Sequence, residues 1–427
     1  MVAINPQIKL VKESATLAIN QKVHALRKQG KTVCHLGFGQ APFNVPSLIQ
    51  ESLKAHAHEK SYLPGSGLPG LCKAVAHYYK NEFNYEYTSD RILIGPGSKE
   101  LLFQLLYMLS GPVLIPAASW VSYAPQATLL NKPYHILNTY ESDNYCLQPA
   151  VLEEACRKLG QEIGLSGQKI LILNSPNNPT GAVYPKSTLE KLAQICKKMN
   201  IIVISDEIYA NINFTDSPHA SIAHYYPEGT IVTGGLSKLF SAGGYRLGVC
   251  LIPAKMGLLY QSLKVMISET FSCVSSPIQY AALTAYSKYD EIKPYLSDCT
   301  KVHEIASKYL HQRFIKMGLS CPIPQGAFYL FPSFEPYSKV IHQLEITTNK
   351  ELADLILEKA QVALLPGEDF YRDLNELTFR VATTDYDGPK ALAAYQNGDI
   401  EKVIIEQHMS NLVKGCDRLE SWLKTLI

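Results

Sequence analysis

The sequence predicts an α/β fold with a mainly parallel sheet in a large domain and a smaller α+β domain. Short apolar runs alternate along the chain with longer segments whose apolar residues recur at helical spacing. Because repetition of strand, helix and strand favours parallel pairing through crossover helices, this alternation indicates the sheet. After about Tyr295 the pattern changes to long helices with shorter strands, which indicates the second domain.

The predicted strands of the large domain are apolar throughout, as expected of strands buried on both faces. They cover residues 91–95, 113–115, 170–173, 201–204, 231–232 and 249–252. Apolar residues at helical spacing predict helices at 99–109, 149–159 and 185–199, and prolines stand near helix starts, where they are tolerated. In the smaller domain we expect strands at 328–331, 362–365 and 377–381. We find no internal repeat, low-complexity tract or linker.

The composition favours a large protein that acts on small molecules. A chain of 427 residues, 46% of them hydrophobic, can bury a sizeable core in more than one domain. Its net charge of +2 gives no electrostatic reason to expect nucleic acid or an anionic membrane as partner. The ten cysteines are scattered without a Cys-x-x-Cys pair or a Cys/His cluster, so we expect reduced thiols and no metal site. The first residues lack the features of a signal peptide and no apolar stretch could cross a bilayer, so we expect a cytoplasmic protein.

Two glycine-rich segments match nucleotide-binding patterns only in part. Residues 65–70 fit G-x-G-x-x-G, but no buried strand precedes them and Pro69 interrupts the turn into a helix. Residues 234–238 are similar to a phosphate loop, yet Leu239 stands where a magnesium-binding hydroxyl is required. We therefore expect neither a dinucleotide site nor an NTPase.

Lys238 lies in a glycine-rich segment, residues 233–248, that also contains Arg246. Glycines on both sides allow a ligand to approach the amine closely, and a neutral lysine amine forms Schiff bases with aldehydes. Upstream, residues 174–181 and 205–209 place polar groups directly after two apolar strands. Since ligands of open α/β sheets bind at the carboxyl ends of the strands, the three segments predict one ligand site.

Taken together, these segments resemble the pyridoxal 5'-phosphate (PLP) enzymes of fold type I, specifically class I aminotransferases of the aspartate aminotransferase type. The resemblance follows the order of the motifs over nearly the whole chain. It implies a seven-stranded, mainly parallel sheet in a PLP-binding domain at residues 45–300. It also implies that residues 1–44 pack with residues 301–427 in the smaller domain.

The resemblance implies roles for five residues around the PLP ring. Lys238 would form the Schiff base and move the proton at the substrate Cα, acting as base and then as acid. Asp206 would supply the buried carboxylate that keeps the pyridine nitrogen protonated. Asn178 and Tyr209 would donate hydrogen bonds to the ring hydroxyl oxygen, and Trp120 would stack on the ring. The alternatives are turn formation by Asn178 and core packing of the two aromatic residues.

The PLP phosphate needs cationic side chains and backbone N–H groups. By resemblance Arg246 supplies the charge, and the N-terminus of a predicted helix supplies the N–H groups. This second set consists of Gly97, Ser98 and Lys99. Tyr62 resembles the tyrosine that reaches the phosphate from the neighbouring subunit, which implies a homodimer.

The chain departs from the family pattern in two places. The position three before the lysine, often serine in this family, is Gly235, and Ser237 or Ser241 could replace that phosphate contact. The usual acid and aspartate after Gly39 are replaced by residues 40–42, Gln-Ala-Pro, which leaves the details of the substrate loop open.

The resemblance assigns Arg380 to the α-carboxylate of the substrate, a group that the bidentate guanidinium suits. It also implies that the backbone at Gly39 approaches the same carboxylate. Pattern alone leaves Arg380 as readily solvated as functional. Ser14, Thr16 and Lys99 resemble residues that bind the side-chain carboxylate of aspartate or glutamate in one subgroup, although Ser14 could simply cap a helix and Lys99 could be solvated. The expected substrate-binding set also includes Trp120 and Asn178.

These assignments predict ping-pong transamination between an amino acid, L-aspartate, and a 2-oxo acid, 2-oxoglutarate. An aromatic or kynurenine-type aminotransferase and a PLP-dependent β-lyase are the alternatives within the fold. A non-catalytic effector domain of a transcription regulator is a third. The retained lysine, aspartate, asparagine, tyrosine and arginines argue against that third alternative.

Overall fold

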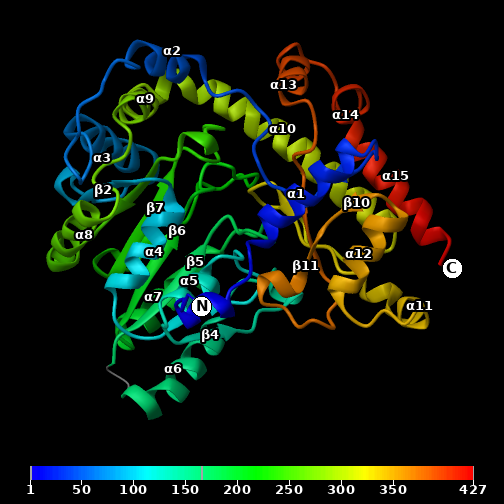
Figure 1. Ribbon diagram of the computed structural model, residues 1–427, viewed down its shortest axis with the longest axis horizontal. Coiled ribbons are helices and arrows are strands. Elements are labelled where there is room, and N and C mark those ends of the chain that lie inside the picture. Colours follow the sequence, from blue (N-terminus) through cyan, green and yellow to red (C-terminus); the bar gives the residue numbers. More distant parts are fainter. Residues whose placement is uncertain (1, 165–166, 427) are drawn as a thin grey trace.

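In a computed structural model, which describes residues 2–164 and 167–426, seven strands form one sheet in the order β2-β8-β7-β6-β5-β3-β4 (Figure 1). The strands are β2 Ile92–Gly95, β3 Val113–Pro116, β4 Tyr134–Leu137, β5 Lys169–Asn174, β6 Ile201–Asp206, β7 Thr230–Gly235 and β8 Gly248–Leu251. Strand β8 runs antiparallel to both of its neighbours, and the other pairs are parallel. The predicted α/β fold with a mainly parallel sheet is confirmed.

Strand β4 is the member of this sheet that the sequence pattern did not predict. It lies at the sheet edge beside β3, and its first residue, Tyr134, is 40% exposed. An edge strand need not be a continuous apolar run, because one side of it faces solvent, and so the run that marks the central strands is missing here.

Alternating residues of the central strands bury opposite faces of the sheet. Ile170 and Ile172 of β5 pack in a cluster with helices α4, α5 and α8. Leu171 and Leu173 pack in another cluster with α6 and α7. A third cluster joins β2, β7 and β8 to α3 and α9. The helices are α3 Pro69–Phe83, α4 Ser98–Met108, α5 Tyr123–Leu129, α6 Pro149–Ile163, α7 Lys186–Lys198, α8 Gly257–Glu269 and α9 Ser276–Ser287.

The long helix α10, Tyr289–Lys316, leads from the large sheet to the C-terminal elements (Figure 1). There, within the same described residues, β11, β12 and β9 form a three-stranded antiparallel sheet and β1 pairs in parallel with β10. These strands are β1 Cys34–His35, β9 Tyr329–Leu330, β10 Val362–Ala363, β11 Leu365–Pro366 and β12 Phe379–Ala382. The remaining helices are α1 Ala15–Lys28, α2 Ser47–Ala55, α11 Ser338–Gln343, α12 Asn349–Lys359, α13 Gly388–Gln396, α14 Glu401–His408 and α15 Ser410–Lys424.

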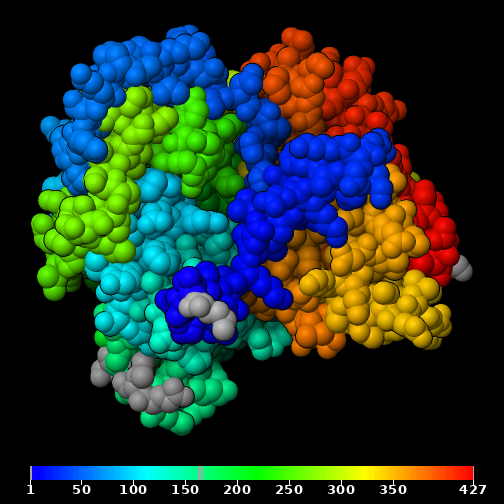
Figure 2. Space-filling view, in the orientation of Figure 1, coloured from blue at the N-terminus to red at the C-terminus, as the bar shows by residue number. Residues whose placement is uncertain are grey.

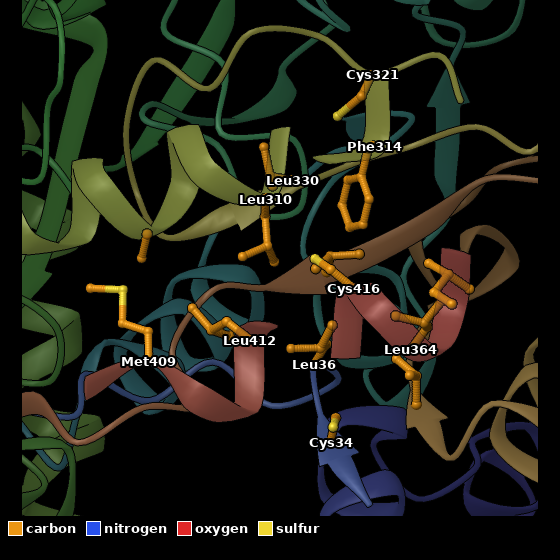
Figure 3. Packing of buried hydrophobic residues seen from close by; sticks show 14 of the residues in the cluster. Cys34, Leu36, Leu310, Phe314, Cys321, Leu330, Leu364, Met409, Leu412 and Cys416 are labelled. Atoms are coloured by element: carbon orange, nitrogen blue, oxygen red, sulfur yellow. The ribbon is translucent and has the colours of Figure 1, made fainter. Parts of the chain in front are cut away.

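The N-terminal segment packs against these C-terminal elements. Cys34 and Leu36 share one buried cluster with Phe314 of α10 and with Leu412 and Cys416 of α15 (Figure 3). Figure 2 shows α1 lying over this part of the surface. The division of the chain after residues 44 and 300 stays a prediction, and α10 runs across residue 300. Residues 1 and 427, the outer limits of the predicted smaller domain, lie outside the described residues.

Two further properties concern the whole described chain. Across residues 2–164 and 167–426, no helix is both long enough and apolar enough to pass through a bilayer. The same residues include all ten cysteines, and each is a free thiol.

We predict that Leu36→Ala lowers the free energy of unfolding by about 3 kcal/mol, because Leu36 is 1% exposed in this cluster and the smaller side chain leaves a cavity. Urea denaturation measures the change. Leu344→Ala is the control, since Leu344 is 46% exposed, and it should cost less than about 1 kcal/mol. Equal losses in the two variants would contradict this account of the packing.

Candidate active site

The polar motifs that follow β5, β6 and β7 meet at the carboxyl edge of the sheet. In the strand register Asn174 pairs with Asp206, and Asp206 pairs with Thr233. The side-chain amide of Asn174 donates to the backbone carbonyl of Asp206 at 2.7 Å, and its oxygen accepts from the backbone N–H of Asn178 at 2.7 Å. Parallel pairing therefore brings the two predicted residues, Asp206 and Asn178, to one place.

Asp206 is 4% exposed, and hydroxyl groups are its side-chain donors. Tyr123 donates to its carboxylate at 2.8 Å and Thr233 at 3.4 Å. Burial raises the pKa of Asp206 to about 6, although these hydrogen bonds act in the opposite direction. Among the described residues it has no ion-pair partner, and a buried carboxylate without a cation is costly. The site is thus suited to a ligand that presents a positive charge to Asp206.

Lys238 follows β7 and lies close to both the N-terminal segment and an aromatic wall. Its Nζ donates to the backbone carbonyl of Gly39 at 3.1 Å. The same nitrogen lies 5.6 Å from the ring centre of Tyr209 and 5.5 Å from that of Phe328. The amine is therefore next to Tyr209, as the sequence motifs suggested, and also next to Gly39.

The loop around Lys238 explains one departure from the family pattern. Gly235 has a φ of 154°, which side-chain-bearing residues rarely adopt, and a Cβ there would lie 2.6 Å from the carbonyl oxygen of Leu247. A serine at this position would require the paired strands β7 and β8 to shift. Ser237 is half-buried, and Ser241 adopts a left-handed φ of 55°.

Arg380, on β12, is 1% exposed. Its guanidinium donates to the carbonyl of Gly37 at 2.7 Å and to the side chain of Asn178 at 3.3 Å, and it stacks 4.7 Å from the ring centre of Tyr329 and 5.1 Å from that of Phe370. Its Nε has no hydrogen-bond partner, and within the described part of the chain no carboxylate forms an ion pair with it. A ligand carboxylate could satisfy both the charge and the free N–H. The strand pattern left burial of Arg380 open, and the structure shows that β12 is buried throughout.

A cluster of cations lies at the N-terminus of α4. Arg246 lies against Gly97, where φ is 92° and a Cβ would be 2.2 Å from the guanidinium, and it donates to the carbonyl of Pro96. Lys99 is exposed, and its Nζ lies 5.0 Å from the ring centre of Trp120 in a cation–π contact. Burial first, and then the nearby charges of Arg246 and Lys238, lower the pKa of Lys99. Arg246, Lys99 and Lys238 form no ion pair within residues 2–164 and 167–426.

Helix α4 begins at Ser98, and Gly97 precedes it without a side-chain hydrogen bond to cap the helix. The first N–H groups of a helix lack partners within the helix and favour anions. Together with Lys99 and Arg246 they form a region suited to a phosphate or a similar anion.

Three predicted residues lie outside this contact network. Tyr62 is 88% exposed. Ser14 occupies the N-cap position of α1 but makes no capping hydrogen bond through its side chain. The hydroxyl of Thr16, in the first turn of α1, is buried without a hydrogen-bond partner.

Sequence analysis missed several residues of the site. Tyr123 supports Asp206 and lies 5.4 Å from Trp120 between ring centres, and Tyr329 contacts Arg380. Trp120 and Tyr123 span the turn just before α5, in which the Tyr123 N–H donates to the Trp120 carbonyl at 3.2 Å, but no motif in the sequence marks that turn. No local signal distinguishes Tyr329 from the other tyrosines of a chain that has 26 of them.

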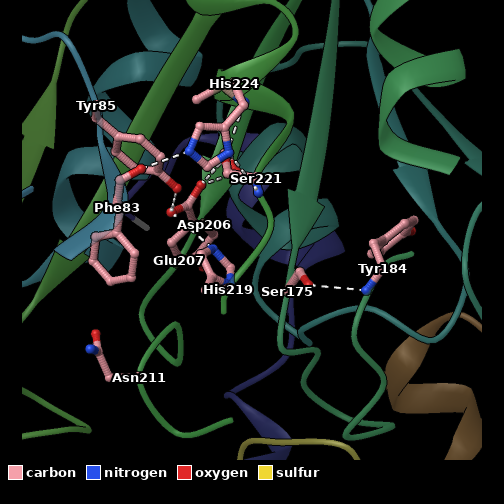
Figure 4. Close-up of polar contacts among 12 residues, drawn as sticks. Phe83, Tyr85, Ser175, Tyr184, Asp206, Glu207, Asn211, His219, Ser221 and His224 are labelled. Atoms are coloured by element: carbon pink, nitrogen blue, oxygen red, sulfur yellow. Dashed lines mark hydrogen bonds and ion pairs between the residues drawn. The ribbon is translucent and has the colours of Figure 1, made fainter. Parts of the chain in front are cut away.

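Glu207 is a second buried carboxylate, directly after Asp206, and it has its own set of donors (Figure 4). The donors are Tyr85 at 2.6 Å, Ser205 at 2.8 Å, Ser221 at 2.5 Å and His219 at 3.2 Å. Burial alone would raise its pKa, but His219 and the hydroxyl groups hold the pKa of Glu207 below its ordinary value. Glu207 is thereby satisfied within the chain, whereas Asp206 lacks a cation.

Comparison with known proteins agrees with this fold. The family model described as aminotransferase class I and II matches residues 31–390. An aspartate aminotransferase of Pinus pinaster is 34% identical over 385 residues, which are 87% of this chain and 76% of that protein.

Solved structures are similar over almost the whole length. The aspartate aminotransferase of Thermus thermophilus with maleate has a TM-score of 0.84 at 25% identity and covers 99% of this chain and 100% of its own. An aromatic aminotransferase of Pyrococcus horikoshii has a TM-score of 0.78 at 28% identity, covering 95% of this chain and 100% of its own. The extent of the family match and of the relative from Pinus pinaster shows that the chain is an enzyme of the class I and II aminotransferase family.

Proposed function

We propose that the protein is a PLP-dependent aminotransferase that transfers the amino group of L-aspartate to 2-oxoglutarate. The observation that carries the proposal is a set of three charged groups, Lys238, Asp206 and Arg380, in one contact network. Among the described residues none of the three forms a salt bridge, and Asp206 and Arg380 are buried. A cofactor and substrate with complementary charges would compensate all three.

The predicted residues fit the groups of PLP that need contacts with the protein, which are the ring nitrogen, the ring hydroxyl oxygen, the ring face and the phosphate. Asp206 would face the ring nitrogen, Tyr209 and Asn178 the ring hydroxyl oxygen, and Trp120 the ring face. The phosphate would lie at the helix terminus formed by Gly97, Ser98 and Lys99, with Arg246 and Ser237 beside it. Such a place for the phosphate is supported by the free N–H groups of α4 and by the unpaired cations. When bound, PLP supplies an aldehyde that accepts the amino group and a ring that withdraws electrons from the substrate Cα.

Lys238 would bind the cofactor covalently and then move a proton at the substrate Cα. A lysine does this only as a neutral amine. Gly39, whose carbonyl accepts from Nζ, orients the amine. Arg380 would hold the substrate α-carboxylate, since it is buried with a free Nε beside Asn178.

Aspartate is the preferred substrate because a second cation and a free hydroxyl are available for its side-chain carboxylate. Lys99 is exposed and forms no ion pair in the described residues, and the hydroxyl of Thr16 is buried without a partner. Ser14 lies two residues before Thr16, at the N-cap position of α1. The Thermus thermophilus relative was solved with maleate, a dicarboxylate.

An aromatic aminotransferase is the second candidate, supported by the similarity to the Pyrococcus horikoshii enzyme. A β-lyase remains distinguishable by its products, because a lyase releases ammonia and pyruvate and a transferase does not. We also propose a homodimer in which Tyr62 contributes to the partner's phosphate site, which its 88% exposure permits. Ten free thiols support a reducing, cytoplasmic setting.

Lys238→Ala is expected to lower turnover of aspartate with 2-oxoglutarate by about 10³-fold or more, because the variant loses both the covalent link and the proton-transfer group. The visible absorption of the PLP-loaded protein provides a second measurement. In the parent protein aspartate should abolish the band of the bound cofactor and 2-oxoglutarate should restore it, and the variant should show neither change. Lys255→Ala, at an exposed position, is the control and should behave like the parent. Full activity in Lys238→Ala would exclude the mechanism.

Asp206→Asn is expected to stabilise the protein without cofactor while weakening its retention of PLP. The pKa of the folded carboxyl is about 6, above its ordinary 3.8. The penalty for ionising it is therefore absent below about pH 4, grows up to about pH 6 and is complete above that. At pH 7.5 the variant should gain about 3 kcal/mol, and near pH 4 nothing. Urea denaturation at a series of pH values measures this.

Asp90→Asn, at an exposed carboxylate, is the control for that series and should show no such pH-dependent gain. If Asp206→Asn were less stable than the parent at pH 7.5, burial of an unpaired charge would not describe this residue.

Lys99→Ala should lower kcat/KM for aspartate relative to phenylalanine by about tenfold or more, because a charge-assisted hydrogen bond to the side-chain carboxylate is lost. Steady-state kinetics with both amino acids give the ratio. Lys99→Arg keeps the charge and should retain most of the preference. An unchanged ratio in Lys99→Ala would assign the aspartate specificity to other residues or favour the aromatic candidate.

A further inference from the structure

Tyr329 is a fully buried residue that connects the two halves of the site. It lies on β9, where it pairs with Ala382 of the neighbouring strand β12, and it is 2% exposed. Because Arg380 lies two residues before Ala382 on that strand, its guanidinium reaches the face of the Tyr329 ring, 4.7 Å from the ring centre. The ring therefore supports the group proposed to hold the substrate carboxylate.

The hydroxyl group of Tyr329 points to the other half. It lies 3.1 Å from the hydroxyl of Tyr209. It also rests against Gly39, where an added Cβ would lie 2.1 Å from the Tyr329 oxygen. Gly39 in turn accepts the hydrogen bond from Lys238. One side chain thus contacts the residues proposed for the substrate, the cofactor and the position of the amine.

Each of the two hydroxyl groups has a single proton, and this limits which of them can donate the hydrogen bond between them. A tyrosine hydroxyl has one proton to donate and can also accept. Burial, and then the neighbouring Tyr329, raise the pKa of Tyr209 far above its ordinary value, so Tyr209 keeps its proton at neutral pH. If Tyr209 uses that proton to donate to the cofactor, the proton between the two tyrosines must come from Tyr329. A hydroxyl that accepts in this way becomes a stronger donor.

We propose that Tyr329 is a positioning residue of the aminotransferase site: its hydroxyl donates to Tyr209 and directs the Tyr209 proton to the ring oxygen of the cofactor, while its ring supports Arg380. The proposal rests on the function proposed above. It goes beyond core packing, because packing in the cluster with Phe328 and Ala382 needs the ring and not the hydroxyl group.

The test is a pH titration of the visible absorption band of the PLP-loaded protein. Hydrogen bonding from Tyr209 withdraws negative charge from the ring oxygen, and a weaker bond leaves more negative charge near the nitrogen of Lys238, which then holds its proton to higher pH. The charged groups that face Tyr209 are Asp206 from β6, Arg380 from β12 and Lys238 from the loop after β7, and none of them is replaced. In Tyr329→Phe the pH at the midpoint of this titration should be higher than in the parent protein by about half a pH unit to one unit.

Tyr87→Phe is the matched control. It also removes a buried hydroxyl group, which donates to the carbonyl of Thr230 at the opposite end of β7 from Lys238. It should leave the midpoint unchanged. In Tyr329→Phe the Kd of maleate, measured by the same absorption, should stay within about twofold, because the ring below Arg380 remains. Tyr329→Leu, which removes the ring, should weaken maleate binding by about fivefold or more.

The outcomes separate the two proposals. A parent protein without a visible band, or without a response to any amino acid, overturns the proposed function and this inference with it. A parent protein that responds, with the same midpoint in Tyr329→Phe and in the parent, leaves the function intact and overturns the role of the Tyr329 hydroxyl. Equal maleate binding in Tyr329→Leu and the parent overturns the role of the ring.

Discussion

The end of strand β6 buries two successive carboxylates, and the site depends on how differently they are satisfied. Glu207 receives hydrogen bonds from hydroxyl groups and from His219, so its charge is compensated within the chain. Asp206 receives hydroxyl donors and, among the described residues, no cation. The hydrogen bonds of Glu207 fix the end of β6 and the loop after it. They thereby hold Asp206, ionised at neutral pH, where a positively charged ligand can pair with its carboxylate.

The same asymmetry recurs across the site. Arg380 is buried with a free N–H, and Lys99 and Arg246 stand together without an acid in the described part of the chain. Burial of Asp206 and Arg380 destabilises the folded chain, because their desolvation is not offset by an ion pair, whereas Lys99 and Arg246 are exposed. The apolar clusters on both faces of the sheet contribute stability that offsets the cost of these buried charges. Under the proposed function, the charges of Asp206 and Arg380 are compensated only when cofactor and substrate bind.

Short-range sequence signals were enough to find the central strands and the motifs that follow them. Asp206 and Asn178 could be placed together because parallel strands align their carboxyl ends. Strand β4 was missed because an edge strand with an exposed Tyr134 lacks a continuous apolar run. Tyr329 and Glu207 were missed because their importance comes from contacts with residues more than 100 positions away, such as Tyr209 and Tyr85. Those contacts depend on how segments far apart in the chain pack against each other, which no local pattern encodes.

The pairing of β1 with β10 has a consequence for how the chain is made. Cys34 emerges from the ribosome early, but its partner Val362 follows about 330 residues later. At ordinary rates of synthesis that interval is roughly 15 to 65 s, during which Leu36 and its apolar neighbours have no native surface to cover them. The large sheet, whose strands lie between residues 92 and 251, can form in the meantime. Early release of an incomplete chain would therefore leave a folded sheet with an exposed apolar N-terminal segment. Chaperones bind exposed apolar segments of this kind.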